Sequence, residues 1–252
     1  MSKTDTNPLP DEGHIDIHAH LLPDIDDGSR SFDETFALIR RLKAAGFTGS
    51  VCTPHIWPEL FPDNTPDVVA ALVRGLQASL DEVGIDYTVW DGGELRLFDG
   101  VIDWMKQHGV PTLGPSRCVL CDFWERQWSA HIDQALEWLI AEGYRPILAH
   151  PERIPVPGDL TEHLDRMAKL GVRLQGNLRC LTMEEPAFSR ERATQYLIDG
   201  RYHVMALDVH RIDTLESRLE GIPLVSKIMN QERVVDLIDA APRRILSHSD
   251  PA

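Results

Sequence analysis

The sequence predicts an α/β fold, a single (β/α)7 barrel of the TIM type. Short apolar segments alternate with amphipathic segments seven times along the chain, which favours parallel strands joined by helical crossovers. A length of 252 residues is enough for one large core, and no low-complexity insert marks a domain boundary. We therefore expect one domain over residues 14–252, preceded by a polar, disordered leader over residues 1–13.

The seven apolar segments are the expected strands. In the first of them His18 and His20 alternate with apolar residues, so both imidazoles point to the same face of the strand. The strands are expected at residues 14–20, 50–55, 87–97, 118–124, 146–150, 172–180 and 202–210.

The segments between the strands carry apolar residues at helical spacing. Ser31 and Glu34 form a capping box for the first helix, which Gly46 ends. Pro66 lies in the first turn of the second helix. Further helices are expected at residues 101–108, 129–142 and 160–170, in the segment up to Gly200, and at residues 225–241.

Composition excludes several classes of protein. A net charge of −15 argues against a nucleic-acid-binding surface, which needs clustered Lys and Arg. No apolar run is long enough to span a membrane, and the first residues lack a secretory signal. Four scattered cysteines are too few for a disulfide framework, so we expect a cytoplasmic protein in which Cys118 and Cys121 have a buried structural role.

Residues able to bind metals gather at the ends of the expected strands. Reacting residues of such barrels lie at the carboxyl ends of the strands. A single histidine there is equally well a hydrogen-bonded core residue, but nine suitable residues together indicate a metal site. They are His18, His20, Asp27, His55, Glu94, Asp122, His150, Asp208 and His210.

Nine ligands exceed the needs of two metals and suit three divalent ions, if one carboxylate bridges. The four carboxylates would leave three dications with a charge of about +2, which attracts a phosphate dianion and favours hydroxide near neutral pH. Histidine mixed with carboxylate suits Mn, Fe or Zn.

Two arginines lie close in sequence to histidines of this set. Arg153 lies three residues after His150, where its guanidinium could hold phosphate oxygens or form a surface ion pair. Arg211 directly follows His210 and could equally point to solvent. Four aromatic residues near strand ends either line a pocket for an aromatic ring or pack in the core: Trp57, Phe61, Trp124 and Trp128.

The segments HIDIHAHLLPDIDDG, VCTPH, GGELRL, LAHPER and ALDVH resemble the polymerase-and-histidinol-phosphatase (PHP) superfamily. Within it they are most similar to bacterial manganese-dependent protein-tyrosine phosphatases of capsule and exopolysaccharide biosynthesis. The resemblance extends from His14 to the closing PRRIL segment. It implies a distorted seven-unit barrel and a trinuclear, Mn²⁺-containing centre. The implied ligand groups are His18, His20, Glu94 and Asp208; Glu94, Asp122 and His150; and Asp27, His55 and His210.

The resemblance also implies the substrate, phosphotyrosine on the tail of a bacterial tyrosine kinase, and a phosphate-binding role for Arg153. Asp122 stands where the family usually has Glu. The second arginine of the family is out of register, and Arg211 or Arg218 is its candidate replacement. With Arg153, we expect Asp208, His210 and Arg211 to serve catalysis.

The expected chemistry is phosphomonoester hydrolysis by a metal-bound hydroxide. A cysteine phosphatase is excluded, because no cysteine has an arginine six positions later. A small-molecule phosphatase of the histidinol-phosphate type and a phosphodiesterase remain alternatives. So do an amidohydrolase, although CVLCDF lacks the lysine usual there, and a metal-binding regulatory protein without activity. A homo-oligomer is compatible with the sequence.

Overall fold

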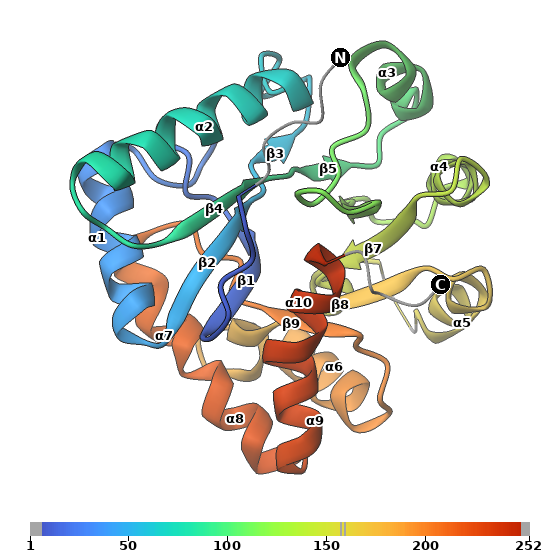
Figure 1. The fold of residues 1–252 in the computed structure, drawn as a ribbon. Helices are drawn as coiled ribbons and strands as arrows, with labels where there is room; N and C mark the ends of the chain where they lie inside the picture. Colours follow the sequence, from blue (N-terminus) through green and yellow to red (C-terminus); the bar gives the residue numbers. More distant parts are fainter. Residues whose placement is uncertain (1–6, 157, 159, 248–252) are drawn as a thin grey trace.

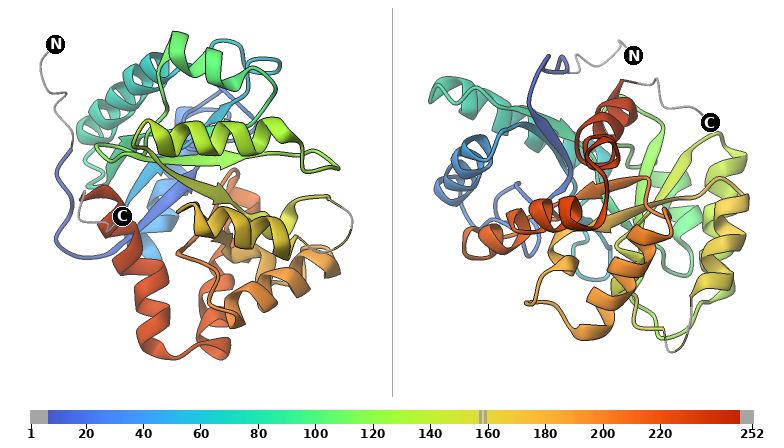
Figure 2. Two further views of the ribbon diagram at one scale, coloured as in Figure 1. Left: turned by 90° about the vertical axis from the view of Figure 1, so that its right-hand side faces the viewer. Right: turned by 90° about the horizontal axis from the view of Figure 1, so that it is seen from below.

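The computed structural model describes residues 7–156, 158 and 160–247. Within them, parallel strands are surrounded on the outside by helices (Figures 1 and 2). Five of the expected strands are continuous: β1 His14–Ala19, β6 Cys118–Asp122, β7 Arg145–Ala149, β8 Arg173–Asn177 and β9 Val204–Ala206.

The other two expected strands are each broken in two. Residues 50–55 correspond to β2 Phe47–Cys52 and β3 His55–Ile56, and residues 87–97 to β4 Thr88–Asp91 and β5 Glu94–Arg96. At the first break Pro54 lacks the backbone donor that a ladder needs. At the second, a Cβ on Gly93 would lie 2.6 Å from Ile56 Cγ1, so the chain can pass there only as glycine.

The strands pair only in parallel, in two sheets ordered β1-β2-β4 and β3-β5-β6-β7-β8-β9. The two breaks carry the chain from one sheet to the other. A parallel bridge between Ala19 and Val209, together with the hydrogen bond from His20 N to Val209 O (2.8 Å), brings the last strand back to the first. The expected distorted barrel of parallel strands is confirmed, with two of its seven expected strands each broken into two segments.

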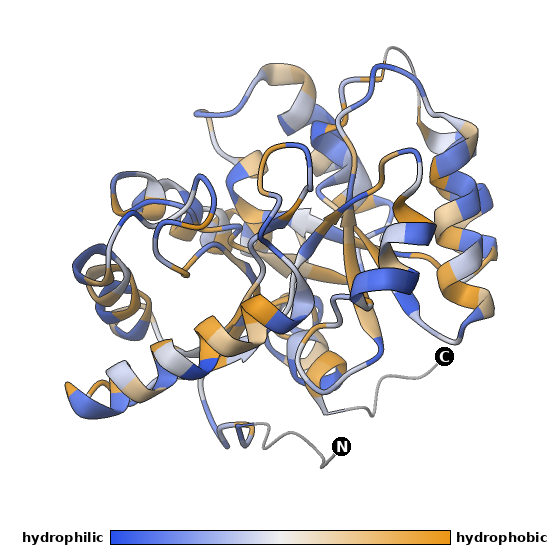
Figure 3. Ribbon diagram, turned by 90° about the horizontal axis from the view of Figure 1, so that it is seen from above, coloured by the Kyte–Doolittle hydropathy of each residue, from blue (hydrophilic) through white to orange (hydrophobic). Residues whose placement is uncertain are grey.

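Six helices cover the barrel, and the starts of the first two agree with the sequence signals. Ser31 Oγ accepts from Glu34 N at the start of α1 Phe32–Ala44, and Thr65 Oγ1 accepts from Val68 N at α2 Pro66–Glu82. Hydrophobic and hydrophilic residues alternate along the helices (Figure 3), and the buried residues of α2, Val69, Val73, Leu76 and Leu80, recur at helical spacing. The remaining four are α3 Val101–His108, α4 Ala130–Ala141, α5 Thr161–Lys169 and α6 Ala187–Ile198.

The prediction of one last helix over residues 225–241 is wrong. The chain divides into α7 Leu215–Leu219, α8 Gly221–Ile228, α9 Gln231–Val235, a π-helical turn Asp236–Ala240 and α10 Ala241–Leu246. Asn230 interrupts the periodicity, because its side chain accepts from Arg233 N at 2.9 Å and so begins a new helix. The sixth strand is also shorter than expected, since Asn177 caps a 3₁₀ helix, Leu178–Leu181, in the same way.

The helix α10 closes the amino-terminal end of the barrel. Ile245 and Leu246 pack on an apolar cluster that includes Ile17 and Ile147, and Arg243 donates to Pro10 O just before β1. The carboxyl ends of the strands are therefore the end at which a site can form.

The expected disordered leader needs correction from residue 7 onward. Asn7 Nδ2 donates to Val89 O (2.9 Å), and Trp90 Nε1 donates to Asn7 O (2.9 Å). These bonds hold residues 7–13 against the domain, whereas residues 1–6 lie outside the described part of the chain.

The cysteines and the lengths of the helices were both considered from composition. All four cysteines are buried free thiols, which confirms the burial expected of Cys118 and Cys121. No helix within the described ranges has the length and apolar character needed to cross a membrane.

Candidate metal centre

A pocket of about 360 Å³ opens at the carboxyl ends of the strands. Beneath it His18 and His20 are fully buried. The structure brings all nine residues of the expected ligand set to this place. The pocket is lined by Asp27, His55, Trp57, Glu94, Arg96, Asp122, Trp124, His150, Arg153, Asp208, His210 and Arg218.

Two histidines and two carboxylates present ligand atoms at the floor of the pocket. His18 Nε2 and His20 Nε2 lie 3.4 Å apart. His18 Nε2 is 3.4 Å from Glu94 Oε2 and 3.3 Å from Asp208 Oδ1, and His20 Nε2 is 3.4 and 3.6 Å from the same two oxygens. Distances of this size are those between ligand atoms that bind one divalent metal at about 2.1 Å.

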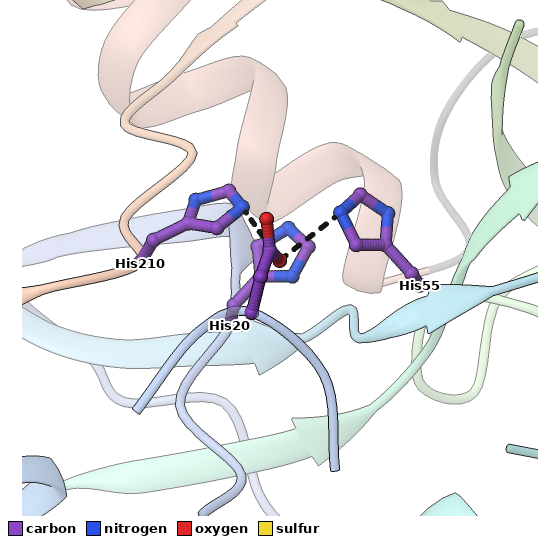
Figure 4. A group of neighbouring side chains, drawn as sticks. His20, His55 and His210 are labelled. Carbon is purple, nitrogen blue, oxygen red and sulfur yellow. Dashed lines mark ion pairs between the residues drawn. The ribbon is translucent and has the colours of Figure 1, made fainter. Parts of the chain in front are cut away.

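A second group lies nearer the mouth. Figure 4 shows His55 and His210 converging from two sides above His20. His55 Nε2 and His210 Nε2 lie 3.2 and 3.4 Å from Asp27 Oδ1. The ring of His210 also stacks on that of His20, with centroids 3.8 Å apart. Together these four residues could hold a metal.

Glu94 connects the floor to a third group. Its Oε1 is 2.8 Å from His150 Nε2, while its Oε2 faces the floor histidines and lies 3.0 Å from His55 Nδ1. Asp122 Oδ1 is 3.9 Å from His150 Nδ1. One carboxylate thus presents each oxygen to a different group, which is the arrangement of a bridging ligand.

Unpaired buried atoms test whether a metal suits these residues. Asp122 Oδ1, His150 Nδ1 and Asp208 Oδ1 are buried and have no hydrogen-bond partner among the described residues. A buried polar atom without a partner is costly, so natural proteins rarely retain one without another ligand. Nine buried side-chain atoms within the described residues lack a partner, and these three of them belong to expected ligands, so the donor set fits divalent metals.

Outer hydrogen bonds orient three of the histidines. His18 Nδ1 donates to Gln175 Oε1 (2.9 Å) and His20 Nδ1 to Asp26 Oδ2 (2.7 Å). His210 Nδ1 donates to the backbone oxygen of Asp208 (3.0 Å). Each bond leaves Nε2 facing the centre as an acceptor for a metal.

The outer partners Gln175 and Asp26 were not expected from the sequence. Asp26 belongs to the same acidic run as Asp27, which is a sequence signal for a role near the metal ligands. Gln175 had none, because it lies on a strand distant in sequence from His18.

Burial and opposite charge act together on the protonation of the site. Burial disfavours a charged His20, but the adjacent Asp26 carboxylate outweighs it and raises the pKa to about 9. Burial likewise opposes protonation of His150, and Glu94 raises its pKa to about 9. Burial alone would raise the pKa of Glu94, yet His18 and His55 hold it well below its usual value. Without metal, an ionised Glu94 therefore lies near protonated His20 and His150.

The backbone is unusual at two of the ligands. His150 and Asp208 have φ of 30° and 52°, a region that residues other than glycine rarely adopt. Asn177 Nδ2 donates to Asp208 Oδ2 at 2.6 Å and holds that carboxylate. Such backbone strain concentrates at functional sites.

The arginines differ from the expectation in one respect. Arg153 lines the pocket and donates from Nη1 to Asp208 Oδ2 (3.1 Å). Arg211, expected to serve catalysis, does not line it and donates instead to Glu34 Oε1 (2.8 Å). Arg211 is extended (φ −134°, ψ 151°), so its side chain points away from that of His210. Arg218 lines the pocket in its place and donates to Leu207 O (2.7 Å).

The four aromatic residues expected near the strand ends occupy different environments. Trp57 and Trp124 line the pocket. Phe61 stacks on His55, with centroids 5.9 Å apart and planes 10° from parallel. Trp128 instead packs against Phe123 and stacks on His163.

Comparisons with known proteins agree on one family. Residues 14–247 match the family model described as capsular polysaccharide synthesis, CpsB/CapC. The tyrosine-protein phosphatase CpsB of Streptococcus pneumoniae is 24% identical over 238 residues, covering 92% of this chain and 98% of that protein. The tyrosine-protein phosphatase YwqE of Bacillus subtilis is 27% identical over 204 residues, covering 79% of this chain and 78% of that protein.

Solved structures show the same fold. Crystal structures of YwqE from Bacillus subtilis and CpsB from Streptococcus pneumoniae are described as metal-dependent tyrosine phosphatases. The match has a TM-score of 0.82 at 22% identity and covers 92% of this chain and 94% of that one. A phosphotriesterase homology protein from Escherichia coli, with phosphate in its active site, is more distant (TM-score 0.60, 12% identity, 94% and 100% coverage).

Proposed function

The chain belongs to the CpsB/CapC family of capsular polysaccharide synthesis, and on that basis we propose that it is a metal-dependent protein-tyrosine phosphatase. The relatives described above are named as tyrosine-protein phosphatases. The observation that carries the proposal is the bridging arrangement of Glu94 in a buried cluster of histidines and carboxylates, with Arg153 beside it.

We also propose that the site holds three divalent ions. Mn²⁺ is the first candidate, and Fe and Zn are the alternatives. The ligand groups are those expected from the resemblance, with Glu94 shared between two of them. His20 also lies within reach of the group formed by Asp27, His55 and His210. Bound divalent ions supply Lewis acidity, which lowers the pKa of water and neutralises charge on a phosphoryl group.

The residues of the chain bind and orient the substrate. Arg153 and Arg218 face the pocket as donors to phosphoryl oxygens, and each is already held by an oxygen of the protein. Asp208 keeps Arg153 in place and, with His210, stands among the ligands. Trp57 and Trp124 provide apolar walls on which a phenyl ring can lie.

The proposed substrate is phosphotyrosine in a protein of capsule synthesis, such as the tyrosine-rich tail of a bacterial tyrosine kinase. Four buried free thiols agree with a cytoplasmic location for this reaction.

The alternative within the same chemistry is hydrolysis of a small phosphomonoester or a phosphodiester. The distant likeness to a phosphotriesterase homology protein concerns the fold. Because the pocket has aromatic walls, it favours an aromatic leaving group over an aliphatic one.

The test compares substrates on the purified, metal-analysed protein. We expect higher kcat/KM for a phosphotyrosine peptide than for histidinol phosphate or bis-p-nitrophenyl phosphate. Activity should be lost with a chelator and return with Mn²⁺. A thiol-alkylating reagent should leave it unchanged, because the four cysteines are buried and none lines the pocket. Sensitivity to alkylation with indifference to chelation would refute the proposal.

A further inference from the structure

We propose that Arg96 is a substrate-binding residue of this site. Its guanidinium lies against Trp57 and donates a hydrogen bond to the phosphoryl group. The inference rests on the proposed phosphoester chemistry and extends it to a residue with no expected role.

The strand register directs Arg96 into the pocket. Glu94 and Arg96 are two residues apart on β5, so their side chains leave the strand on the same side. In the parallel pairing of β5 with β6, Arg96 lies opposite Asp122, the last residue of its strand. Arg96 therefore stands at the same rim of the barrel as two of the proposed ligands, and it lines the pocket.

The contacts of Arg96 fix the orientation of its guanidinium but leave a donor free. Its Cζ lies 4.8 Å from the centroid of Trp57, a cation–π contact that holds the group in place. Nη1 is 3.8 Å from Asp122 Oδ2, too long for a hydrogen bond. Nη1 is buried and has no hydrogen-bond partner within the described part of the protein.

The other two arginines of the pocket differ in this respect. Arg153 Nη1 donates to Asp208, and Arg218 Nη1 donates to Leu207 O. A guanidinium has five N–H donors and no acceptor, so a buried donor without a partner is costly unless a ligand supplies an oxygen. A phosphoryl oxygen in the pocket provides such an acceptor.

Two pairs of arginine and tryptophan thus face the same cavity. Arg96 lies over Trp57, and Arg153 lies over Trp124 with its Cζ 5.5 Å from the ring centroid. The pairs come from different strand ends and place a cation and an aromatic face together. A phosphate attached to a phenyl ring needs both kinds of contact.

The test measures binding of inorganic phosphate to the metal-loaded protein by titration calorimetry at fixed ionic strength. For Arg96→Ala we expect the Kd for phosphate and the KM for a phosphotyrosine peptide to rise about tenfold or more. Arg96→Lys keeps the charge but loses the planar fork, so its affinity should lie between those of Arg96→Ala and the wild type.

Arg117→Ala is the matched control. Arg117 also lies over an aromatic ring, Tyr144, with its Cζ 4.4 Å from the centroid, but it does not line the pocket. This variant should bind phosphate as the wild type does. Trp57→Leu should weaken phosphate binding as well, and its effect should not add to that of Arg96→Ala, because both remove one positioned guanidinium.

Metal content and Tm separate binding from a structural role. If Arg96→Ala loses metal or unfolds at lower temperature while the remaining folded, metal-loaded protein binds phosphate normally, the inference is overturned. It is also overturned if the wild type, fully loaded with metal, binds no phosphate. If the wild type hydrolyses no phosphotyrosine but binds phosphate in an Arg96-dependent way, the proposed function fails and the inference stands.

Discussion

Glu94 Oε1 lies 2.8 Å from His150 Nε2, so the bridging carboxylate joins the floor of the pocket to the HPER segment that follows β7. This contact links residues 56 positions apart in the sequence.

Glu94→Gln should remove the bridge. An amide supplies one neutral oxygen instead of two charged ones, so we expect fewer bound metals per chain and a loss of kcat of about a hundredfold or more. Metal analysis and kinetics measure both effects. The exposed Glu82→Gln at the end of α2 is the control, and unchanged metal content in Glu94→Gln would contradict the bridging role.

Asp26→Asn should weaken metal binding without removing a ligand. Asp26 Oδ2 accepts from His20 Nδ1 and from His55 N (3.0 Å), so it orients two of the histidines. Loss of such an outer carboxylate typically lowers metal affinity 10–100-fold. Asp24→Asn is the control, because Asp24 is exposed and asparagine tolerates its φ of 59°. Equal metal affinities of the two variants would contradict this role.

Metal binding should strengthen as pH rises from about 6.5 to 9. Without metal, His20 and His150 have pKa values of about 9, because neighbouring carboxylates outweigh burial. A metal must displace these protons, so calorimetry in buffers of different ionisation enthalpy should show proton release at pH 7. Binding that takes up protons, or is independent of pH in this range, would argue against these protonation states.

The same pKa values predict the stability of the chelator-treated protein. Both pKa values are raised above the unfolded value, so their contribution is fully present below pH 6.5 and is lost as pH rises through 9. We expect Tm to fall over this window. The fall should be smaller in Asp26→Asn, which lacks the carboxylate that raises the pKa of His20.

Arg153 and Arg211 should differ sharply in their kinetic roles. Arg153→Lys loses the planar fork beside Asp208, and we expect kcat/KM for a phosphotyrosine peptide to fall about tenfold or more. Arg211→Ala breaks only the ion pair with Glu34, so kcat/KM should stay within about twofold of the wild type. A larger loss in Arg211→Ala than in Arg153→Lys would reverse this assignment.

The sequence by itself predicted the parallel barrel and the nine residues that meet at its rim. The physical reason is that strand alternation and the parallel rule depend only on local pattern and order. His18, His20 and Asp208 could thus be placed together before any coordinates. Capping at Ser31 is equally local.

The tertiary structure alone decided which side chains complete the site. Arg211 turns from the pocket because the chain stays extended after His210, and Arg218 reaches it from the next helix. Arg96 and Asp26 gained their roles from partners on other segments, Trp57 and His20. Direction beyond a strand end and contact between distant segments depend on packing of the whole chain, which no local periodicity encodes.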